Sequence, residues 1–497
     1  MSPAASAAPS RNSPVAAVMR SGAANRKFDG PRVAHLVGVG GQGMRSLAQL
    51  LTQAGWRLSG SDVCHVPAMV LGLPRLTVAH GHAAGNIPGD ATEVIHSAAI
   101  DPGNPELVAA RRRGLAVTSY VDKLAELVRD RELAAVAGTH GKSTSTAMLA
   151  EILTRARLDP LVVCGAEPIE SDCAGWHQGG RYGCGDLAVL EACEYRRHFL
   201  RFRPRWAAVT GIEADHVDCY ENLEELVAAF AQFARQVESG GRLLLSADCA
   251  LSRSIEESAV ARVETFSADV EADWQATSLQ SVAGRYRFSL VHRGQEQARL
   301  QLAVPGRHNV HNALVAAALA LCMGAAGKDV IAGLESFRGL RRRLEPIGEH
   351  QGVAWWTDYA HHPSEVCAAI ETLREVYPGR RITVIFQPHQ QSRTRHFFAD
   401  FVESLCLADR VAICDVYAAR ERAGGDRPGI ARELAAAIGD RGVTTLDEHT
   451  LKQILPCIER TCRRGDVVVT MGAGDIAAKY YEYADWIRRR CARGCSA

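Results

Sequence analysis

Residues 133–144 read Leu-Ala-Ala-Val-Ala-Gly-Thr-His-Gly-Lys-Ser-Thr. The first five form an unbroken apolar run, which is typical of a strand buried on both faces of a parallel sheet. Glycines, a lysine and hydroxyl residues follow, and residues 145–155 have the composition of a helix. A strand, a glycine loop and a helix in this order predict a nucleoside triphosphate site, because loop amides and the helix terminus can hold phosphates.

Two polar residues of this loop have a defined task in such a site. We expect Lys142 to neutralise the β- and γ-phosphate oxygens, and the Ser143 hydroxyl to ligate Mg²⁺. The strict phosphate-loop pattern has glycine at position 136, where this chain has Val136. The Gly141-Lys142-Ser143 core is intact, so the departure weakens the generic match and leaves the predicted chemistry unchanged.

Two further segments open in a similar way. Residues 33–44 run from an apolar strand into glycines and a helix, and Asp62 follows the glycines by about 20 positions, as in a Rossmann β-α-β unit. Taken alone, this pattern favours a nicotinamide oxidoreductase, although glycine loops also form tight turns in any α/β protein. Strands at 353–356, 382–386 and 466–470 each end at polar residues, which predicts a third open parallel sheet.

The sequence therefore predicts an α/β protein with a Rossmann-like N-terminal domain, a central P-loop ATPase domain and a Rossmann-like C-terminal domain. A chain of 497 residues suits about three domains of roughly 150 residues. We place them at residues 29–127, 128–336 and 337–497, after a disordered tail at residues 1–28 that is rich in Ala, Ser and Pro. A transit peptide is the alternative for this tail, since acidic residues are absent before Asp29.

Composition excludes several classes of protein. With 47% hydrophobic and 23% charged residues the chain is typical of a globular protein, and no apolar run reaches the roughly 18 residues that span a bilayer. A formal net charge of +1 gives no general basic field for nucleic acid. The 15 cysteines are scattered and never in C-x-x-C spacing, which argues against disulfide frameworks and zinc ribbons. We expect a cytoplasmic protein without membrane or nucleic-acid partners.

Eight motifs, taken together, resemble the Mur ligase family. They follow the family's order from about residue 33 to residue 476, which is most of the chain. They are residues 38–44 (GVGGQGM), 60–62 (GSD), 97–100 (SAAI), 138–144 (GTHGKST), 212–218 (IEADHVD), 305–309 (PGRHN), 358–363 (DYAHHP) and 386–389 (FQPH). The resemblance implies an ATP-dependent ligase of peptidoglycan synthesis that joins L-alanine to the lactyl carboxylate of UDP-N-acetylmuramate through an acyl phosphate.

The resemblance also assigns roles to individual residues, with the first domain binding the UDP-sugar and not NAD, which decides against the oxidoreductase. The UDP-sugar contacts would be Gly40, Gly41, Gln42, Gly43, Met44, Ser61, Asp62, Ser97 and Ala98. The ATP contacts would be Gly138, Thr139, His140, Gly141, Lys142, Ser143, Thr144, Asn309, Asn312, Arg343 and Asp358. The ligands of Mg²⁺, with Mn²⁺ as the alternative ion, would be Ser143, Glu191 and His216. The amino acid would contact Tyr359, His361 and Arg393, and the catalytic group would be Lys142, Glu191, His216, His361 and Arg393.

Departures from the family's pattern leave alternatives open. Gln390 stands where the members that add L-alanine usually have an additional arginine, so the carboxylate clamp could be weaker or the amino acid could differ. Cys193, Arg196 and Arg197 stand beside Glu191, where the family has acidic or small residues. The two arginines would either recruit more negative charge on the sugar substrate or lie on the solvated surface.

Rival functions share much of this pattern. A sibling ligase that attaches a stem tripeptide to UDP-N-acetylmuramate in cell-wall recycling has almost all of the motifs. A non-catalytic UDP-sugar or ATP sensor is the remote alternative, if the changes at residues 193–198 disable the metal site. For the ligase, the partners would be UDP-N-acetylmuramate and L-alanine, and the chain would be a monomer or a weak homodimer.

Overall fold

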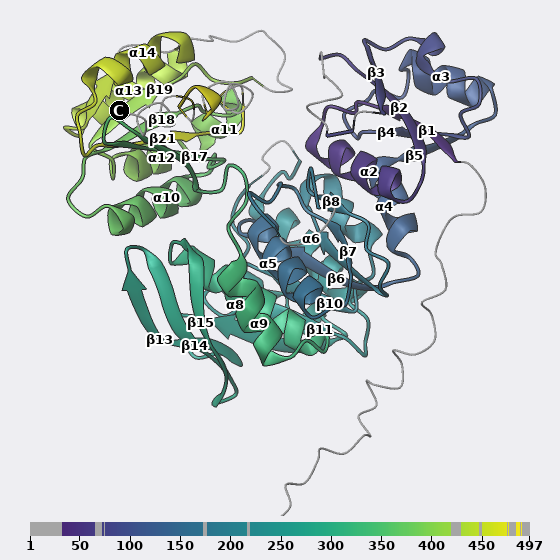
Figure 1. Cartoon of the computed structure of the whole chain (residues 1–497), viewed down its shortest axis with the longest axis horizontal. Coiled ribbons are helices and arrows are strands. Elements are labelled where there is room, and N and C mark those ends of the chain that lie inside the picture. The colour runs from purple at the N-terminus through teal and green to yellow at the C-terminus, as the bar shows by residue number, and fades with distance from the viewer. Residues whose placement is uncertain are drawn as a thin grey trace, which may run out of the picture.

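The computed structural model describes residues 32–64, 72–73, 75–171, 176–215, 219–418, 429–446, 450–474, 476, 484–487 and 489. Within these residues the strands form three sheets, of five, ten and six strands. Figure 1 shows the sheets in three lobes, with the central lobe between the other two. The α/β class predicted from the sequence is confirmed. The predicted tail at residues 1–28 lies outside the described residues.

The first lobe is a parallel sheet with the strand order β3-β2-β1-β4-β5. Its elements are β1 (Val33–Val37), α2 (Gln42–Gln53), β2 (Arg57–Asp62), β3 (Thr77–His80), η1 (Ala84–Asn86), β4 (Glu93–His96), α3 (Pro105–Arg112), β5 (Ala116–Ser119) and α4 (Tyr120–Val128). The chain crosses to opposite sides of β1, so β1 and β4 flank a topological switch point, where such sheets bind ligands.

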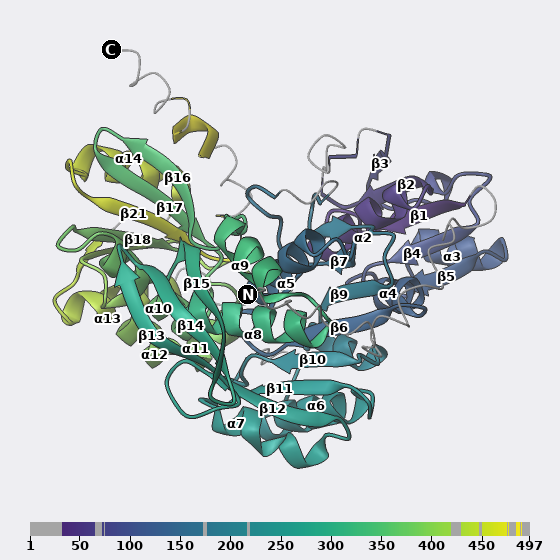
Figure 2. The same ribbon diagram turned by 60° about the horizontal axis from the view of Figure 1, so that its bottom comes forward.

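The central lobe places β6, the apolar run of the sequence, between β9 and β10 in a parallel arrangement. Its strands are β6 (Glu132–Ala137), β7 (Leu161–Val163), β8 (Gly180–Arg181), β9 (Leu187–Glu191), β10 (Trp206–Val209), β11 (Arg242–Ser246), β12 (Arg262–Ser267), β13 (Trp274–Val282), β14 (Arg285–His292) and β15 (Gln295–Pro305). Its helices are α5 (Lys142–Arg155), η2 (Tyr195–Arg201), α6 (Leu223–Gln236), α7 (Ala250–Ser254), η3 (Glu256–Ser258), α8 (His308–Cys322) and α9 (Gly327–Ser336). The antiparallel ribbon β13-β14-β15 extends the sheet. Figure 1 shows the ribbon below the C-terminal lobe, and in the turned view of Figure 2 it comes forward over the helices of that lobe.

The C-terminal lobe has the strand order β16-β17-β21-β18-β19-β20. Its elements are β16 (Glu345–His350), β17 (Val353–Asp358), α10 (Pro363–Val376), β18 (Ile382–Phe386), α11 (Gln391–His396), α12 (Phe398–Leu405), β19 (Arg410–Ile413), α13 (Gly429–Asp440), β20 (Thr444–Leu446), α14 (Leu451–Thr461) and β21 (Val467–Met471). The sequence predicted a parallel sheet, and the strands pair in parallel except for β16, which runs antiparallel to β17. The two-residue connection between them permits only a hairpin.

The lobes are joined in different ways. Buried apolar residues of the first lobe, such as Leu36 and Leu47, share one cluster with Leu161 and Leu190 of the central lobe. The C-terminal lobe has buried clusters of its own, against which Ala214 of the central lobe also packs. The C-terminal lobe therefore has the looser apolar attachment to the central lobe.

Among the described residues, no helix is both long and apolar enough to cross a membrane.

Candidate active site

A cavity of about 2350 Å³ lies where the three lobes meet. The loops that follow β1, β6 and β17 all contribute to its lining, with Gly41, Gly141 and Tyr359 as examples. In open α/β sheets, ligands bind beyond the carboxyl ends of the strands. The geometry therefore joins three such ligand-binding edges in one space.

The loop after β6 has the backbone that a phosphate site needs. Gly138 and Gly141 have φ angles of 122° and 79°, in the left-handed region that favours glycine. A Cβ atom at Gly138 would lie 2.2 Å from Thr210 Oγ1, and one at Gly141 would lie 2.3 Å from Asn312 Oδ1. Helix α5 begins directly at Lys142, so its unpaired N–H groups lie beside this loop and suit the oxygens of a phosphate.

Lys142 is held by a carboxylate that the sequence analysis did not single out. Its Nζ lies 2.9 Å from Glu194 Oε1 and donates to the carbonyl oxygens of Gly138 and Thr139 at 2.5 and 3.0 Å. Burial lowers the pKa of Lys142, but the charges of Glu194 and Glu191 and the hydrogen bond to Glu194 together outweigh burial and raise the pKa above its ordinary value. Lys142 is therefore a fixed cation. One signal pointed to Glu194, since it follows Glu191 by three residues at the end of β9.

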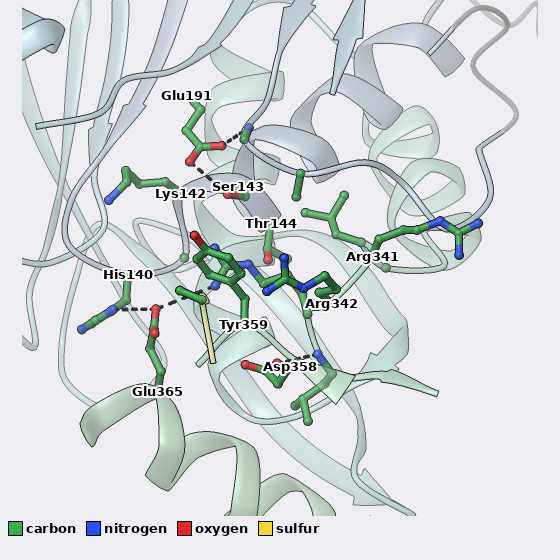
Figure 3. Close-up of a pocket in the computed structure, with 18 of the residues that line it drawn as sticks. His140, Lys142, Ser143, Thr144, Glu191, Arg341, Arg342, Asp358, Tyr359 and Glu365 are labelled. Atoms are coloured by element: carbon green, nitrogen blue, oxygen red, sulfur yellow. Dashed lines mark hydrogen bonds and ion pairs between the residues drawn. The ribbon is translucent and has the colours of Figure 1, made fainter. Parts of the chain in front are cut away.

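Ser143 and Glu191, two of the predicted metal ligands, lie side by side in Figure 3. Ser143 Oγ donates to Glu191 Oε1 at 3.0 Å, and the backbone N–H of Gly165 donates to Glu191 Oε2. A hydroxyl and a carboxylate at a helix N-terminus are hard oxygen donors of the kind that Mg²⁺ prefers. The residues present therefore fit this ion. The third predicted ligand, His216, lies outside the described residues.

The unusual residues beside Glu191 take different positions. Burial, with the nearby Glu194 carboxylate, raises the pKa of Cys193 to about 12, so this cavity-lining thiol stays neutral at pH 7. Arg196 donates to the carbonyl oxygen of Ala98 at 2.5 Å, and Arg197 forms a partly exposed ion pair with Glu225 at 2.6 Å. Both arginines line a smaller cavity of about 370 Å³, not the large one.

Two of the predicted ATP contacts, Asn309 and Asn312, lie against the phosphate loop. Asn312 Nδ2 donates to Asn309 Oδ1 at 2.9 Å, and Ser145 Oγ of α5 donates to Asn312 Oδ1 at 3.2 Å. The structure therefore brings these asparagines next to the helix that begins at Lys142. The predicted ATP contacts that line the cavity are Thr139, His140, Gly141, Lys142, Ser143, Thr144, Asn309, Asn312, Arg343 and Asp358.

Asp358 organises the segment that enters the C-terminal lobe, as Figure 3 shows. Its carboxylate accepts hydrogen bonds from the backbone N–H groups of Leu344 and Ala360, both at 2.6 Å. Burial raises the pKa of Asp358 to about 6, against the opposite effect of Arg343. The Arg343 guanidinium lies 5.0 Å from the centre of the Tyr359 ring. The segment that leads into the C-terminal lobe thus carries a cation toward the cavity.

The predicted amino-acid contacts, Tyr359, His361 and Arg393, all line the cavity. Arg393 is 4% exposed and forms an ion pair with Asp215 of the central lobe. Burial lowers the pKa of Arg393 to about 10, so the side chain stays cationic at pH 7. His361 Nδ1 lies 3.0 Å from the Tyr359 carbonyl oxygen. Gln390, just before α11, also lines the cavity. Nothing in the structure explains why this chain has glutamine at a position where arginine is usual.

The predicted UDP-sugar residues divide into two groups. Gly40, Gly41, Gln42 and Asp62 line the large cavity, and Asp62 Oδ2 accepts from the Gly40 N–H at 2.8 Å. This hydrogen bond ties the loop after β1 to the end of β2. Ser61 lies deeper, where its hydroxyl donates to Glu106 Oε2 at 2.6 Å.

The other predicted UDP-sugar residues lie away from the large cavity. Met44 is buried in the core, and a Cβ atom at Gly43 would lie 2.8 Å from the Tyr120 ring, so these positions serve packing of α2. Ser97 Oγ accepts from the Ala99 N–H at 3.3 Å. Ala98 lines the smaller cavity.

His140 links the phosphate loop to the C-terminal lobe. Its Nδ1 lies 3.1 Å from Glu365 Oε1 of α10, and its Nε2 lies 3.0 Å from Glu213 Oε2. Burial lowers the pKa of His140, but the hydrogen bonds to Glu213 and Glu365 outweigh burial and raise the pKa to about 9. The hydrogen bond between His140 and Glu365 thus links the central and C-terminal lobes beside the phosphate loop.

Comparison with protein families gives one consistent result along the chain. Residues 33–132 match the profile described as Mur ligase family, catalytic domain. Residues 136–320 match the Mur ligase middle domain, and residues 342–474 match the Mur ligase, glutamate ligase domain.

Curated relatives and solved structures agree with these matches. A UDP-N-acetylmuramate–L-alanine ligase of Chlorobium phaeobacteroides (strain BS1) is 38% identical over 467 residues, 92% of this chain and 98% of that protein. The corresponding ligase of Aquifex aeolicus is 36% identical over 445 residues, 89% and 95% of the two chains. The crystal structure of UDP-N-acetylmuramate-alanine ligase from Thermotoga maritima gives a TM-score of 0.75 at 27% identity, over 93% and 99% of the chains. A murein peptide ligase from Psychrobacter arcticus gives 0.67 at 25% identity, over 91% and 98%.

Proposed function

The chain belongs to the Mur ligase family, and we propose that it joins L-alanine to the lactyl carboxylate of UDP-N-acetylmuramate, with ATP as the energy source. The products would be ADP, phosphate and the first peptide-bearing precursor of peptidoglycan. The observation that carries this proposal is the shared cavity at the ends of β1, β6 and β17. A ligase with three substrates needs their reacting groups in one place, and three ligand-binding edges meet there.

The reaction requires activation of a carboxylate. A carboxylate and an amine do not condense in water, so the γ-phosphoryl group of ATP passes to the carboxylate and ADP leaves. The neutral amine of alanine then attacks the acyl carbon, the amide bond forms, and phosphate departs. Two anions must approach each other in the first step, which makes charge compensation the main task of the site.

The phosphate loop supplies part of that compensation. Lys142 and the N-terminus of α5 would contact the β- and γ-phosphates. Ser143 and Glu191 would hold Mg²⁺, or Mn²⁺ in its place. Such an ion, when bound, neutralises phosphate charge and orients the transferred group. His216 stays a predicted ligand.

Two cations of the site are paired with acids of the protein. Lys142 pairs with Glu194, and Arg393 pairs with Asp215. In our proposal the phosphates replace Glu194, and the alanine carboxylate replaces or joins Asp215 at the planar guanidinium. The acids would thus keep both cations in position until the anionic substrates arrive.

The C-terminal lobe would close over the bound substrates. It meets the central lobe through hydrogen bonds and ion pairs such as His140–Glu365 and Arg393–Asp215. Closure brings Tyr359, His361 and Arg393 toward the phosphate loop and excludes water, which protects an acyl phosphate from hydrolysis.

We also propose a cytoplasmic location and a monomer or weak homodimer. Cysteines of the described residues such as Cys164, Cys193 and Cys414 carry thiols outside any disulfide, which agrees with a reducing compartment. Light scattering after size-exclusion chromatography, over a range of protein concentrations, tests the oligomeric state.

The decisive experiment measures phosphate release from ATP with Mg²⁺ and UDP-N-acetylmuramate. L-Alanine, glycine, L-serine and the stem tripeptide serve as alternative acceptors. We expect release that requires both the UDP-sugar and L-alanine, and that disappears in Lys142→Ala. Lys328→Ala is the matched control, because Lys328 is an exposed lysine at the start of α9.

Each outcome has a clear meaning. A requirement for the tripeptide would assign the chain to recycling instead of synthesis. Tight nucleotide binding without phosphate release for any acceptor would refute the ligase and leave a sensor. Equal activity of Lys142→Ala and Lys328→Ala would contradict the assigned role of the phosphate loop.

A further inference from the structure

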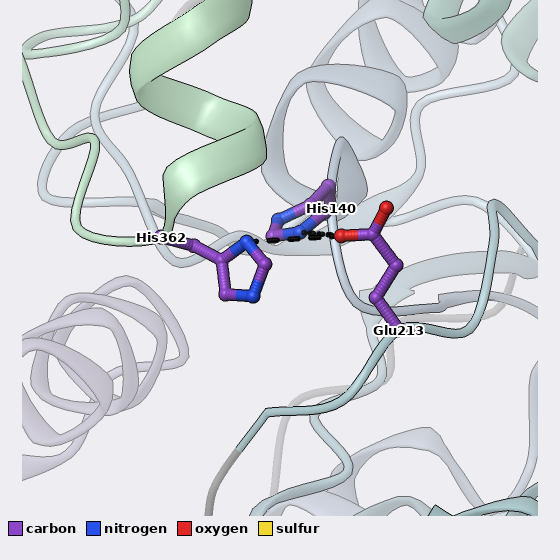
Figure 4. A group of neighbouring side chains, drawn as sticks. All are labelled: His140, Glu213 and His362. Carbon is purple, nitrogen blue, oxygen red and sulfur yellow. Dashed lines mark hydrogen bonds and ion pairs between the residues drawn. The ribbon is translucent and has the colours of Figure 1, made fainter. Parts of the chain in front are cut away.

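Three side chains from two lobes converge beside the phosphate loop, as Figure 4 shows. His140 belongs to the loop, Glu213 follows β10, and His362 immediately precedes α10. Glu213 Oε2 lies 3.0 Å from His140 Nε2 and 3.7 Å from His362 Nδ1, and the possible ligand atoms all lie within 4.8 Å of one another. Bonds of about 2.0 to 2.1 Å in a tetrahedral zinc site place neighbouring ligand atoms about 3.3 Å apart. The two observed distances lie on either side of that value.

In each histidine, the ring nitrogen that faces away from Glu213 lies within hydrogen-bonding distance of an oxygen acceptor. His140 Nδ1 lies 3.1 Å from Glu365 Oε1, and His362 Nε2 lies 3.2 Å from the Ala214 carbonyl oxygen. His362 Nδ1 accepts from the Ser364 N–H at 3.3 Å, which requires its proton to be on Nε2. Metal-binding histidines nearly always donate their other N–H to a carboxylate or carbonyl oxygen, which fixes the ring and the tautomer. The cluster therefore has the supporting contacts of a metal site, and an ion bound there would replace the proton on His140 Nε2 and the Ser364 N–H at His362 Nδ1.

We propose that His140, Glu213 and His362 bind a divalent transition metal ion of the zinc class, with water as the fourth ligand. Two imidazoles and one carboxylate form a donor set typical of three-ligand zinc sites. Mg²⁺ prefers oxygen donors and keeps most of its waters, so it would favour the Ser143–Glu191 pair over this cluster. The site is thus distinct in chemistry from the predicted magnesium site.

The ion would tie the lobes together. His140 and Glu213 belong to the central lobe, whereas His362 is the N-cap residue of α10 in the C-terminal lobe. A ligand that binds one arrangement of the lobes stabilises that arrangement over those in which the three side chains are apart. Where the proposed ligase function holds, the ion would slow lobe opening and product release, and so act as an inhibitor. Metal binding itself does not depend on that function.

A second cluster in the described residues provides a control. Asp248, Asp269 and His311 also bring possible ligand atoms within reach of one another. Asp269 is paired with Arg307, and all three side chains belong to the central lobe. A metal ion at that position would compete with the Arg307 guanidinium for the Asp269 carboxylate, and it would not link the lobes.

The first test titrates Co²⁺ into the full-length chain in excess Mg²⁺ and follows visible absorption. Co²⁺ replaces Zn²⁺ in such sites, and its spectrum separates nitrogen and oxygen ligands from cysteine thiolates. We expect one tight equivalent, displaced by Zn²⁺, without a thiolate band. His362→Asn and Glu213→Gln should each weaken binding by about tenfold or more, and His311→Asn should leave it unchanged. The change His362→Asn is not expected to unfold α10, since asparagine is itself a good helix cap.

A further variant, Glu365→Gln, leaves all three proposed ligands in place and changes only a residue that orients one of them. Glu365→Gln weakens the acceptor for His140 Nδ1, and loss of such a supporting contact typically lowers metal affinity by about tenfold to a hundredfold. Equal Co²⁺ binding in the parent, His362→Asn and Glu213→Gln would overturn the proposal, as would a thiolate band or absence of tight binding. The trio would then be a hydrogen-bonded contact between lobes and no more.

The second test addresses the link between the lobes. Small-angle X-ray scattering of the chain without nucleotide should show a smaller radius of gyration on addition of Zn²⁺. The change should be absent in His362→Asn and present in His311→Asn. A radius that does not respond in the parent, although the metal binds, would overturn the link. Both tests are independent of ligase activity, so failure of the proposed function would not mimic failure of the metal site.

Discussion

Two glycine loops open onto the same cavity, yet their surroundings suit different ligands. The loop after β6 carries Lys142 and Ser143, and Glu191 lies next to the Ser143 hydroxyl. The loop after β1, residues 38–41, contains neither lysine nor arginine; its Gly40 N–H is bound to the Asp62 carboxylate, and Arg45 of α2 donates to its Gly40 carbonyl oxygen at 2.8 Å. A glycine loop shows that a ligand can approach the backbone closely. In the proposed function the side chains beside each loop distinguish the ligands: Lys142, Ser143 and Glu191 suit a polyphosphate with its cation at β6, and the Asp62 carboxylate suits hydroxyl groups of a nucleoside sugar at β1.

Removal of the negative charge at the β6 loop should have the largest effect. Glu191→Gln keeps the size of the side chain but removes a predicted metal ligand. We expect turnover to fall by about a hundredfold to a thousandfold, with a higher Mg²⁺ requirement in phosphate-release assays. Binding of UDP-N-acetylmuramate without ATP, measured by calorimetry, should change by less than about threefold. An equal loss of UDP-sugar binding would erase the distinction between the loops.

A methyl group at the β6 loop tests its close packing. In Gly138→Ala the new Cβ atom would lie 2.2 Å from Thr210 Oγ1 and 2.7 Å from the Thr210 amide nitrogen, at a φ of 122°. Strain and overlap together should lower the free energy of unfolding by about 2 to 4 kcal/mol, as measured by urea denaturation. Gly114→Ala is the control, because Gly114 has a φ of 69° with nothing within 4 Å of a Cβ atom. It should lose only about 1 kcal/mol, and equal losses would exclude overlap as the cause.

The β6 loop was predictable because its signals are local. Residues 133–137 are buried on both faces of the sheet, so they form a continuous apolar run, and the glycine, lysine and serine follow directly. The side-by-side arrangement of Ser143 and Glu191 follows from the parallel pairing of β6 with β9, which places both strand ends at one edge. The place of the β6 loop at the edge of the sheet could therefore be predicted from the sequence.

Contacts between distant segments were not predictable in the same way. Lys142–Glu194 depends on the turn that follows β9, and Arg393–Asp215 depends on how the C-terminal lobe sits against the central lobe. The ribbon β13-β14-β15 was missed as well, because β14 and β15 are partly exposed strands with a polar face and lack a strong apolar signal. The burial of Met44 depends on the face that α2 turns toward the sheet, which a motif does not specify.

Glu106, which lies behind the β1 loop, should make the stability of the first lobe depend on pH. Glu106 accepts hydrogen bonds from Ser61 Oγ and Asn86 Nδ2 at 2.6 and 2.5 Å. Burial raises its pKa, but the nearby His35 ring and the hydrogen bonds from Ser61 and Asn86 together outweigh burial and lower the pKa to about 2. An acid with a lowered pKa stabilises the fold above its unfolded-state pKa of about 4.3, and this contribution is lost as the pH falls toward 2.

Glu106→Gln should therefore cost about 1 to 3 kcal/mol at pH 7, and the difference from the parent should shrink between pH 4.5 and the acid limit of the titration. Urea denaturation at several pH values measures this difference. A cost that is independent of pH would show that Glu106 acts through packing and not through its charge. Nucleotide binding at the β6 loop should be unaffected at pH 7, because Glu106 lies in the first lobe.

The smallest effect is expected at Gly41, where the β1 loop faces the cavity. Its Cβ atom would meet only the Gly38 carbonyl oxygen, at an ordinary 3.7 Å, so Gly41→Ala should change the free energy of unfolding by less than about 0.5 kcal/mol. If the UDP-sugar lies against this backbone, the methyl group should raise the KM for UDP-N-acetylmuramate by about threefold to tenfold and leave the KM for ATP unchanged. A rise in the KM for ATP instead would mean that the two loops share one ligand, and the division between a sugar loop and a phosphate loop would fail.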